Sequence, residues 1–151
     1  MATREDCPPA DHQHRETWAL EDVLMIPAAI AAGLGELGKH GSIINRKHGS
    51  SFRLSMVTTD LPLEPDKPDV FGADQFCKNC QLCDNACPPD AIFSDKKMVR
   101  GNIKWYVNFD KCIAYFVDNK TCGICLAVCP WSRPGVAGNL LNKMAKRLAK
   151  N

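Results

Sequence analysis

The sequence has no long hydrophobic run and no strong excess of charge of either sign. Its longest uncharged stretch, Val23 to Gly35, contains Pro27 and is shorter than the ~20 apolar residues that a membrane-spanning helix needs. The first twenty residues also lack the apolar core of a secretory signal peptide. The formal net charge is +2, which does not indicate binding to nucleic acid or to an anionic membrane. We therefore expect no transmembrane segment and no nucleic-acid partner.

Cysteine, in contrast, is abundant: the chain has nine, and eight of them lie between positions 77 and 129. The first group, CKNCQLCDNACP, contains Cys77, Cys80, Cys83 and Cys87. The second group, which ends in CGICLAVCP, contains Cys112, Cys122, Cys125 and Cys129. The last three cysteines of the two groups are separated by the same 42 residues. The chain therefore contains an internal duplication, with a longer first loop in the second copy.

The spacing C-x2-C-x2-C-x3-C-P is typical of two-cluster ferredoxins, in which the fourth cysteine ligates the other cluster. It predicts that one [4Fe–4S] cluster is held by Cys77, Cys80, Cys83 and Cys129. The second cluster is then held by Cys87, Cys112, Cys122 and Cys125. Two four-cysteine zinc sites are an alternative, but zinc ribbons need no third and fourth cysteine followed by proline. A disulfide framework is disfavoured because no export signal is visible, and Cys7 is expected to be a free thiol.

The stretch GLGELG, residues 33–38, matches the G-x-G-x-x-G pattern of dinucleotide-binding loops. That fingerprint requires a strand before it and a helix after it. Here an Ala-rich helical segment precedes the glycines and a Gly/His/Lys loop follows, so a nucleotide site is disfavoured. Two interpretations stay open: helix termination with tight turns, or close approach of the backbone to a different flat cofactor. The glycines concerned are Gly33, Gly35, Gly38 and Gly41.

Hydrophobic patterning predicts a few regular elements around the cysteines. Alternation predicts a strand over Ser51 to Thr59 and another over Gly101 to Phe109. The inward positions of the second strand would be Ile103, Trp105, Val107 and Phe109. Residues 15–34 have helical composition, divided by Pro27, and residues 138–151 form an expected amphipathic helix with solvated lysines.

Several stretches, taken together, resemble the C-terminal part of the cobalamin-dependent reductive dehalogenases. In chain order they are AAGLGELGKHGS, SSFRLSMVTTDLPLEP, the duplicated cysteine motif, GNIKWYVNFDKC and TCGICLAVCPW. The resemblance runs from about Met25 to Arg133. A sister family, the epoxyqueuosine reductases, has a similar module and a similar CPW ending, but the KWYVNFDKC stretch is more similar to the dehalogenases.

The resemblance implies an oxidoreductase whose two [4Fe–4S] clusters deliver electrons to a corrinoid that removes halide from an organohalide. It implies that the glycine loop, with Gly33, Gly35, Gly38 and Gly41, lies against the corrin or its nucleotide tail. His40 and His48 are not expected to ligate cobalt, because the D-x-H-x-x-G motif of His-ligated corrinoid proteins is absent. The corrinoid-binding core and the tyrosine proton donor of the family lie upstream of the matched region. We therefore expect no catalytic residue here, and cobalamin binding only with that upstream half, in cis or in trans.

The expected fold class is α+β, with a ferredoxin-like two-[4Fe–4S] domain preceded by a helix–glycine loop–strand module. The expected parts are a polar leader (1–16, disordered or truncated), the module resembling the end of a corrinoid-binding domain (17–70), the cluster domain (71–134) and an amphipathic helix (135–151). An electron donor protein or a quinol-linked donor is the expected partner. The location is cytoplasmic by default, whereas a twin-arginine signal on a full-length chain would indicate a membrane-associated exported enzyme. Alternative functions are a stand-alone ferredoxin-type carrier and the tail of an epoxyqueuosine reductase.

Overall fold

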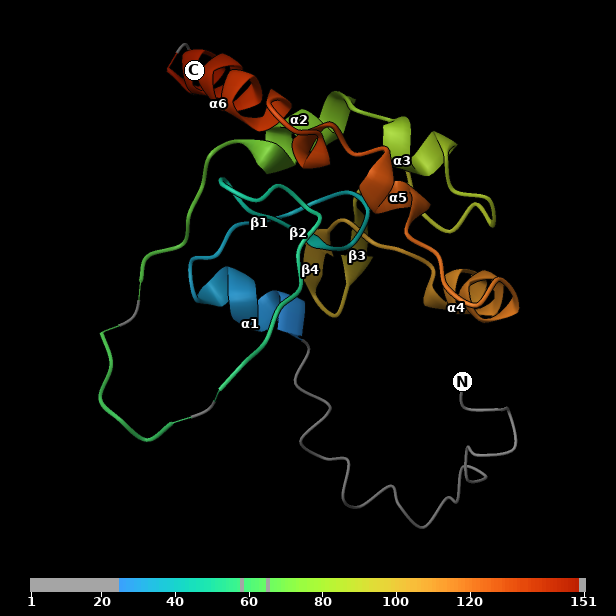
Figure 1. Ribbon diagram of the computed structural model, residues 1–151, viewed down its shortest axis with the longest axis horizontal. Helices are drawn as coiled ribbons and strands as arrows, with labels where there is room; N and C mark the ends of the chain where they lie inside the picture. The colour runs from blue at the N-terminus through green and yellow to red at the C-terminus, as the bar shows by residue number, and fades with distance from the viewer. Residues whose placement is uncertain (1–24, 58, 65, 150–151) are drawn as a thin grey trace.

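The computed structural model describes residues 25–57, 59–64 and 66–149, which form short helices and two small hairpins (Figure 1). The chain enters through α1 (Met25–Ala31). Pro27 lies in the first turn of this helix, where its missing N–H would have no intrahelical acceptor, so it is tolerated there. The mixture of helices and strands confirms the coarse α+β expectation. The part of the expected helix before Met25 lies outside the described residues.

The glycine loop is folded into a short antiparallel hairpin of β1 (Glu36–Leu37) and β2 (Ile43–Ile44). Leu37 pairs with Ile43, and the N–H of Gly38 donates to the carbonyl of Ser42 at 2.8 Å, which closes the turn between the strands. Lys39 and His40 form the tip of this hairpin and are both buried. Tight turns are one of the two interpretations left open for these glycines, whereas the two short strands and the burial of the polar tip are findings of the structure.

The duplication in the sequence is also a duplication of structure. Each copy has a helix carrying the first cysteine, α2 (Ala73–Asn79) or α4 (Phe109–Asp118), followed by a four-residue helix, α3 (Leu82–Asn85) or α5 (Ile124–Ala127). Both bounds of α5 lie 42 residues after those of α3. The two short helices pack against each other, as Figure 1 shows. The third cysteines of the groups, Cys83 and Cys125, lie on these short helices.

A hairpin of β3 (Lys97–Val99) and β4 (Asn102–Lys104) separates the two copies. Its two turn residues, Arg100 and Gly101, have φ of 50° and 80°, as a two-residue turn matched to the strand twist requires. The strand expected over residues 101–109 is thus confirmed only in its first part. Trp105 is buried as expected, but Ile103 and Phe109 are 67% and 66% exposed. Ile103 is exposed because the hairpin has only two strands and forms no larger sheet with a buried face. Phe109 is exposed because it begins α4 instead of continuing the strand.

The strand predicted over Ser51 to Thr59 is wrong. The described positions 51–57 and 59 form no strand, and Met56 and Val57 are exposed. Alternation of apolar residues makes a strand only where a neighbouring strand accepts its backbone hydrogen bonds, and none pairs with this segment in the described part of the chain. Leu61 and Leu63, further along the same loop, are exposed as well.

The hydrophobic core lies where the β1–β2 hairpin, α2, the 3-10 turn Pro130–Ser132 and α6 (Val136–Leu148) meet (Figure 1). Trp131 is central to it: Phe71 and Phe76 pack edge-to-face on its ring, with centroids 5.5 and 5.6 Å away. Met144 of α6 is fully buried against the same cluster. Because Cys77 and Cys129 are members of this core, one of the cysteine sites is built into the packed centre of the structure. No helix in the described residues is long and apolar enough to cross a membrane.

Candidate metal centre

Four cysteines from both copies of the duplication border one pocket. Its lining includes Cys77 of α2, Cys80, Cys83 of α3 and Cys129 from the end of the second copy. Three of these side chains, Cys77, Cys83 and Cys129, are only 5–6% exposed. Cys87, the fourth cysteine of the first group, is not in this lining. The structure therefore brings together the four residues that the spacing predicts as one ligand set.

The other four cysteines lie close enough to influence one another electrostatically. Burial raises the pKa of the Cys112 thiol, and charge on Cys87 and Cys122 raises it further. Burial also raises the pKa of Cys125, and negative charge on Cys122, Cys87 and Cys112 raises it further. All four are partly exposed. The backbone N–H of Ala91 donates to the Sγ of Cys87 at 3.4 Å, which fixes one thiol of this second set.

The cysteines of both sets have the chemistry expected of ligands for a positively charged metal group. All eight of these cysteines are free. Burial raises the pKa of Cys77 and of Cys83 to about 12, so neither loses its proton easily without a compensating charge. Within the described residues, no three Cys, His, Asp or Glu side chains converge on a point that would hold a single metal ion. Thiolate formation at Cys77 and Cys83 therefore depends on the positive charge of a bound metal group.

The pocket of the first set is also lined by a buried lysine that sequence reasoning missed. Lys39 is 1% exposed, and its Nζ lies 5.1 Å from the centroid of the Trp105 ring. Its Nζ is 3.7 Å from Oδ2 of Asp84, close enough for charge attraction but too long for a hydrogen bond. The ammonium therefore has a counter-charge but no hydrogen-bond acceptor. The backbone N–H of Lys39 points at the Cys77 sulfur and lowers its pKa, against the larger effect of burial.

His40 lines the same pocket and is held in one orientation. The backbone N–H of Ser42 donates to its Nδ1 at 3.1 Å, while its Nε2 is buried without a partner. Burial lowers the pKa of His40 to about 4, so the ring is neutral near pH 7. A Cβ at Gly38 would lie 2.8 Å from the His40 ring, so the glycine makes room for the imidazole.

No pattern in the sequence identifies these residues. Lys39 and His40 follow the glycines in what reads as a polar loop, and only the hairpin pairing of Leu37 with Ile43 turns them inward. Trp131 follows Cys129 and Pro130, and its Nε1 is likewise buried without a partner.

The pocket fits a [4Fe–4S] cluster. Among the described residues, three buried N–H donors without an acceptor belong to side chains that line it: Lys39 Nζ, His40 Nε2 and Trp131 Nε1. Buried N–H groups normally donate a hydrogen bond, so a ligand of this pocket is expected to be rich in hydrogen-bond acceptors and negatively charged. A cluster with four thiolates and inorganic sulfides has both properties, whereas a hydrophobic ligand has neither.

The four predicted cofactor-contacting glycines pack against atoms of this chain. Gly33 has φ of +76°, and a Cβ there would lie 2.5 Å from the carbonyl oxygen of Lys67. Gly35 packs against the carbonyl of Ile44, and Gly41 against the side chain of Val107. These contacts support the interpretation of the glycines as requirements of the turn and of close packing.

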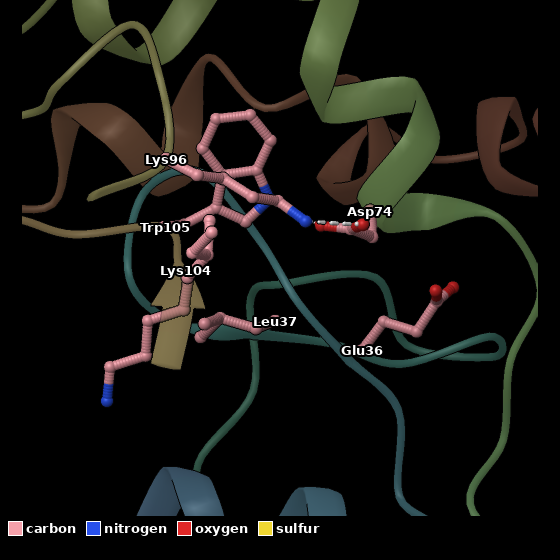
Figure 2. Close-up of a pocket in the computed structure, with 7 residues that line it drawn as sticks. Glu36, Leu37, Asp74, Lys96, Lys104 and Trp105 are labelled. Atoms are coloured by element: carbon pink, nitrogen blue, oxygen red, sulfur yellow. Dashed lines mark hydrogen bonds and ion pairs between the residues drawn. The ribbon is translucent and has the colours of Figure 1, made fainter. Parts of the chain in front are cut away.

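A second, open cleft of about 290 Å³ lies between β1, α2 and the β3–β4 hairpin (Figure 2). Figure 2 shows Asp74 directed toward Trp105 and Lys96, with Lys104 pointing away from them. The Nε1 of Trp105 donates to Asp74 Oδ1 at 2.7 Å, and Lys96 Nζ lies 2.8 Å from Asp74 Oδ2. No cysteine lines this cleft. Its Asp74 instead orients the Trp105 ring, whose face contacts the Lys39 ammonium.

Comparisons with known proteins agree with this geometry. The family described as "4Fe-4S dicluster domain" matches residues 76–132. A tetrachloroethene reductive dehalogenase of Desulfitobacterium hafniense is 37% identical over 123 residues, covering 73% of this chain and 22% of the relative. An epoxyqueuosine reductase of Leadbetterella byssophila is 35% identical over 118 residues, covering 67% of this chain and 34% of the relative.

A solved reductive dehalogenase structure, described as suggesting a mechanism for B12-dependent dehalogenation, has a TM-score of 0.69 and 35% identity. The match covers 77% of this chain and 18% of that one. This chain thus spans about a fifth of the length of the dehalogenases that it matches.

Proposed function

We infer that this chain, which belongs to the reductive dehalogenase family and matches its C-terminal iron–sulfur part, transfers electrons through two [4Fe–4S] clusters. The observation that carries the proposal is the pocket in which Cys129 of the second copy meets Cys77, Cys80 and Cys83 of the first. Each cluster, when bound, would accept and release one electron at low potential. The eight cysteine thiolates would hold the clusters, and the packing of α3 on α5 keeps the two ligand sets adjacent.

The first ligand set is proposed to be Cys77, Cys80, Cys83 and Cys129, and the second Cys87, Cys112, Cys122 and Cys125. The residues around the first set exclude water, since Cys77, Cys83 and Cys129 are nearly fully buried. The second set is partly exposed, which suits electron entry from a donor protein or a quinol-linked donor. We therefore propose the second set as the entry point.

We further propose that the electrons serve a cobalamin-dependent removal of halide from an organohalide, performed together with a corrinoid-binding half in cis or in trans. The support is the similarity to tetrachloroethene reductive dehalogenases and to a structure described in terms of B12-dependent dehalogenation. The exposed apolar side chains of the 51–64 segment, Met56, Val57, Leu61 and Leu63, offer a surface for such a half. A contact of the glycine loop, with Gly33, Gly35, Gly38 and Gly41, to the corrinoid stays a prediction.

The test is anaerobic reconstitution of the chain with iron and sulfide. We expect about eight irons per chain, reversible reduction by dithionite, and no dehalogenation by the chain alone. Cobalamin is expected to be retained only when the corrinoid-binding half of a reductive dehalogenase is added. Uptake of zinc in place of iron would contradict the electron-transfer function. If the chain binds eight irons but the mixture retains no cobalamin, the proposed electron transfer stands and the proposed cooperation with a corrinoid-binding half is contradicted.

The match to epoxyqueuosine reductase supports a second candidate, the tail of such a reductase, for which the family resemblance implies action on transfer RNA. Its 35% identity to this chain is close to the 37% of the tetrachloroethene reductive dehalogenase of Desulfitobacterium hafniense. Binding of transfer RNA in a filter assay separates the two, because the dehalogenase function predicts none.

A further inference from the structure

The unpartnered donors at the first cysteine set have a role that no motif identifies. Nζ of Lys39, Nε2 of His40 and Nε1 of Trp131 are buried without an acceptor, and all three residues line the pocket of Cys77, Cys80, Cys83 and Cys129. They come from two distant parts of the chain, the tip of the β1–β2 hairpin and the 3-10 turn after Cys129. We refer to Lys39, His40 and Trp131 as the donor cap.

The tautomer of His40 follows from its backbone contact. The N–H of Ser42 donates to Nδ1, so this nitrogen carries a lone pair and the ring proton resides on Nε2. Nε2 is therefore a donor, like the indole Nε1 of Trp131. The ring lies close to the backbone of Gly38, where a Cβ would come within 2.8 Å of it. Both N–H groups are therefore buried without an acceptor in residues that line the pocket.

The charge of Lys39 is fixed close to the same pocket. Its ammonium rests over the Trp105 ring, which Asp74 holds through a 2.7 Å hydrogen bond. Asp84 attracts it from 3.7 Å but leaves its N–H groups without an acceptor. Lys39 and Cys83 line the same pocket, so the positive charge lies beside the sulfur ligands.

The second cysteine set has a different environment. Its four cysteines are partly exposed, and no Lys, His or Trp donor left buried without an acceptor in the described residues lies outside the donor cap. One-electron reduction adds a negative charge to a cluster, and a nearby cation and N–H donors to sulfur stabilise the reduced form. The two clusters are therefore expected to differ in potential.

We propose that the donor cap of Lys39, His40 and Trp131 raises the reduction potential of the cluster held by Cys77, Cys80, Cys83 and Cys129 above that of the second cluster. An electron supplied by a low-potential reductant then resides on the buried cluster, whose charge changes by one unit with no bond made or broken. This inference rests on the proposed function, because it requires that both clusters form.

The test is a dithionite titration of the anaerobically loaded chain, followed by electron paramagnetic resonance of the reduced clusters. In Lys39→Met we expect the equilibrium constant for reduction of one cluster to fall at least tenfold, which is 59 mV for one electron, while the other cluster is unchanged. Trp131→Phe keeps an aromatic ring and removes one N–H, so a smaller shift in the same direction is expected. Lys39→Arg keeps the charge and should shift the potential little.

The matched control is Lys143→Met, which removes an exposed charge on α6 and should leave both potentials unchanged because solvent screens it. Unchanged potentials in Lys39→Met and Trp131→Phe, with about eight irons bound, would overturn the donor cap and leave the proposed function intact. A chain that binds no iron–sulfur cluster would instead contradict the proposed function itself.

A measurement on the unsubstituted chain keeps the inference testable if a variant fails to load. Labelling histidine and tryptophan with ¹⁵N should give a hyperfine coupling to the cluster that is reduced first. Coupling of these nitrogens to neither cluster would overturn the inference without any variant.

Discussion

At the scale of the residue, Asp84 and Lys39 act on the Cys83 sulfur in opposite directions. The Asp84 carboxylate raises the pKa of Cys83 and the Lys39 ammonium lowers it, while the two groups lie 3.7 Å apart. Because a carboxylate destabilises an additional negative charge, Asp84→Asn is expected to raise the potential of the cluster that Lys39→Met lowers. The shift is measured in the same redox titration.

Asp118→Asn serves as the control for this prediction, because Asp118 is exposed near the end of α4. A downward shift in Asp84→Asn would show that the carboxylate acts by orienting Lys39 and not through its own charge. No shift at all would place Asp84 outside the electrostatic reach of the cluster.

A second residue-scale prediction concerns Glu36, which joins the glycine hairpin to the cysteine part. Its Oε2 accepts from the backbone N–H of Phe71 at 3.0 Å and of Ala73 at 2.7 Å. Glu36→Ala leaves both donors without an acceptor, at a cost of about 1–3 kcal/mol for each that stays away from water. We expect the melting temperature of the loaded chain to fall by several degrees. Glu64→Ala, at an exposed position, should have no such effect.

At the scale of the element, the packing of α3 on α5 predicts that ligands are exchanged between the two copies. If Cys77 and Cys129 belong to one cluster, the double variant Cys77→Ser/Cys129→Ser loses that cluster only and keeps about half of the iron. The matched double variant Cys77→Ser/Cys87→Ser removes one ligand from each cluster and should lose nearly all of it. Iron and sulfide analysis after anaerobic loading gives both numbers. The reverse result would mean that each copy of the duplication holds its own cluster.

Sequence patterns predicted these elements unevenly, for physical reasons. The cysteine spacing predicts a ligand set that includes Cys129, and in the structure Cys129 lines one pocket with Cys77, Cys80 and Cys83, whereas the clusters themselves stay a prediction. The strand over Ser51 to Thr59 failed because alternation says nothing about whether a partner strand exists. The burial of Lys39 and His40 could not be predicted from sequence patterns, because it depends on the pairing of Leu37 with Ile43. It also depends on packing near Trp105 and Trp131, which are distant in the sequence.

At the scale of the whole molecule, the core is placed asymmetrically with respect to the two ligand sets. Cys77 and Cys129 share the core with Trp105, Trp131 and Met144. The second set lies outside it, and its Cys112 is part of α4, which has no buried residue. An internal duplication has therefore produced two sites of similar sequence but different solvent access, and access governs how readily a cluster is attacked.

This asymmetry predicts the order in which the clusters are lost. When the loaded chain is exposed to a strong iron chelator in the absence of oxygen, we expect two phases, each releasing about half of the iron. The first phase should come from the partly exposed set, because water and chelator reach Cys112 and Cys122 before Cys77 and Cys129. Alkylation after the first phase, followed by peptide mass spectrometry, should label Cys112 and Cys122 and leave Cys77 and Cys129 unlabelled. Simultaneous loss in one phase, or labelling of the core cysteines first, would show that the buried core does not protect its cluster.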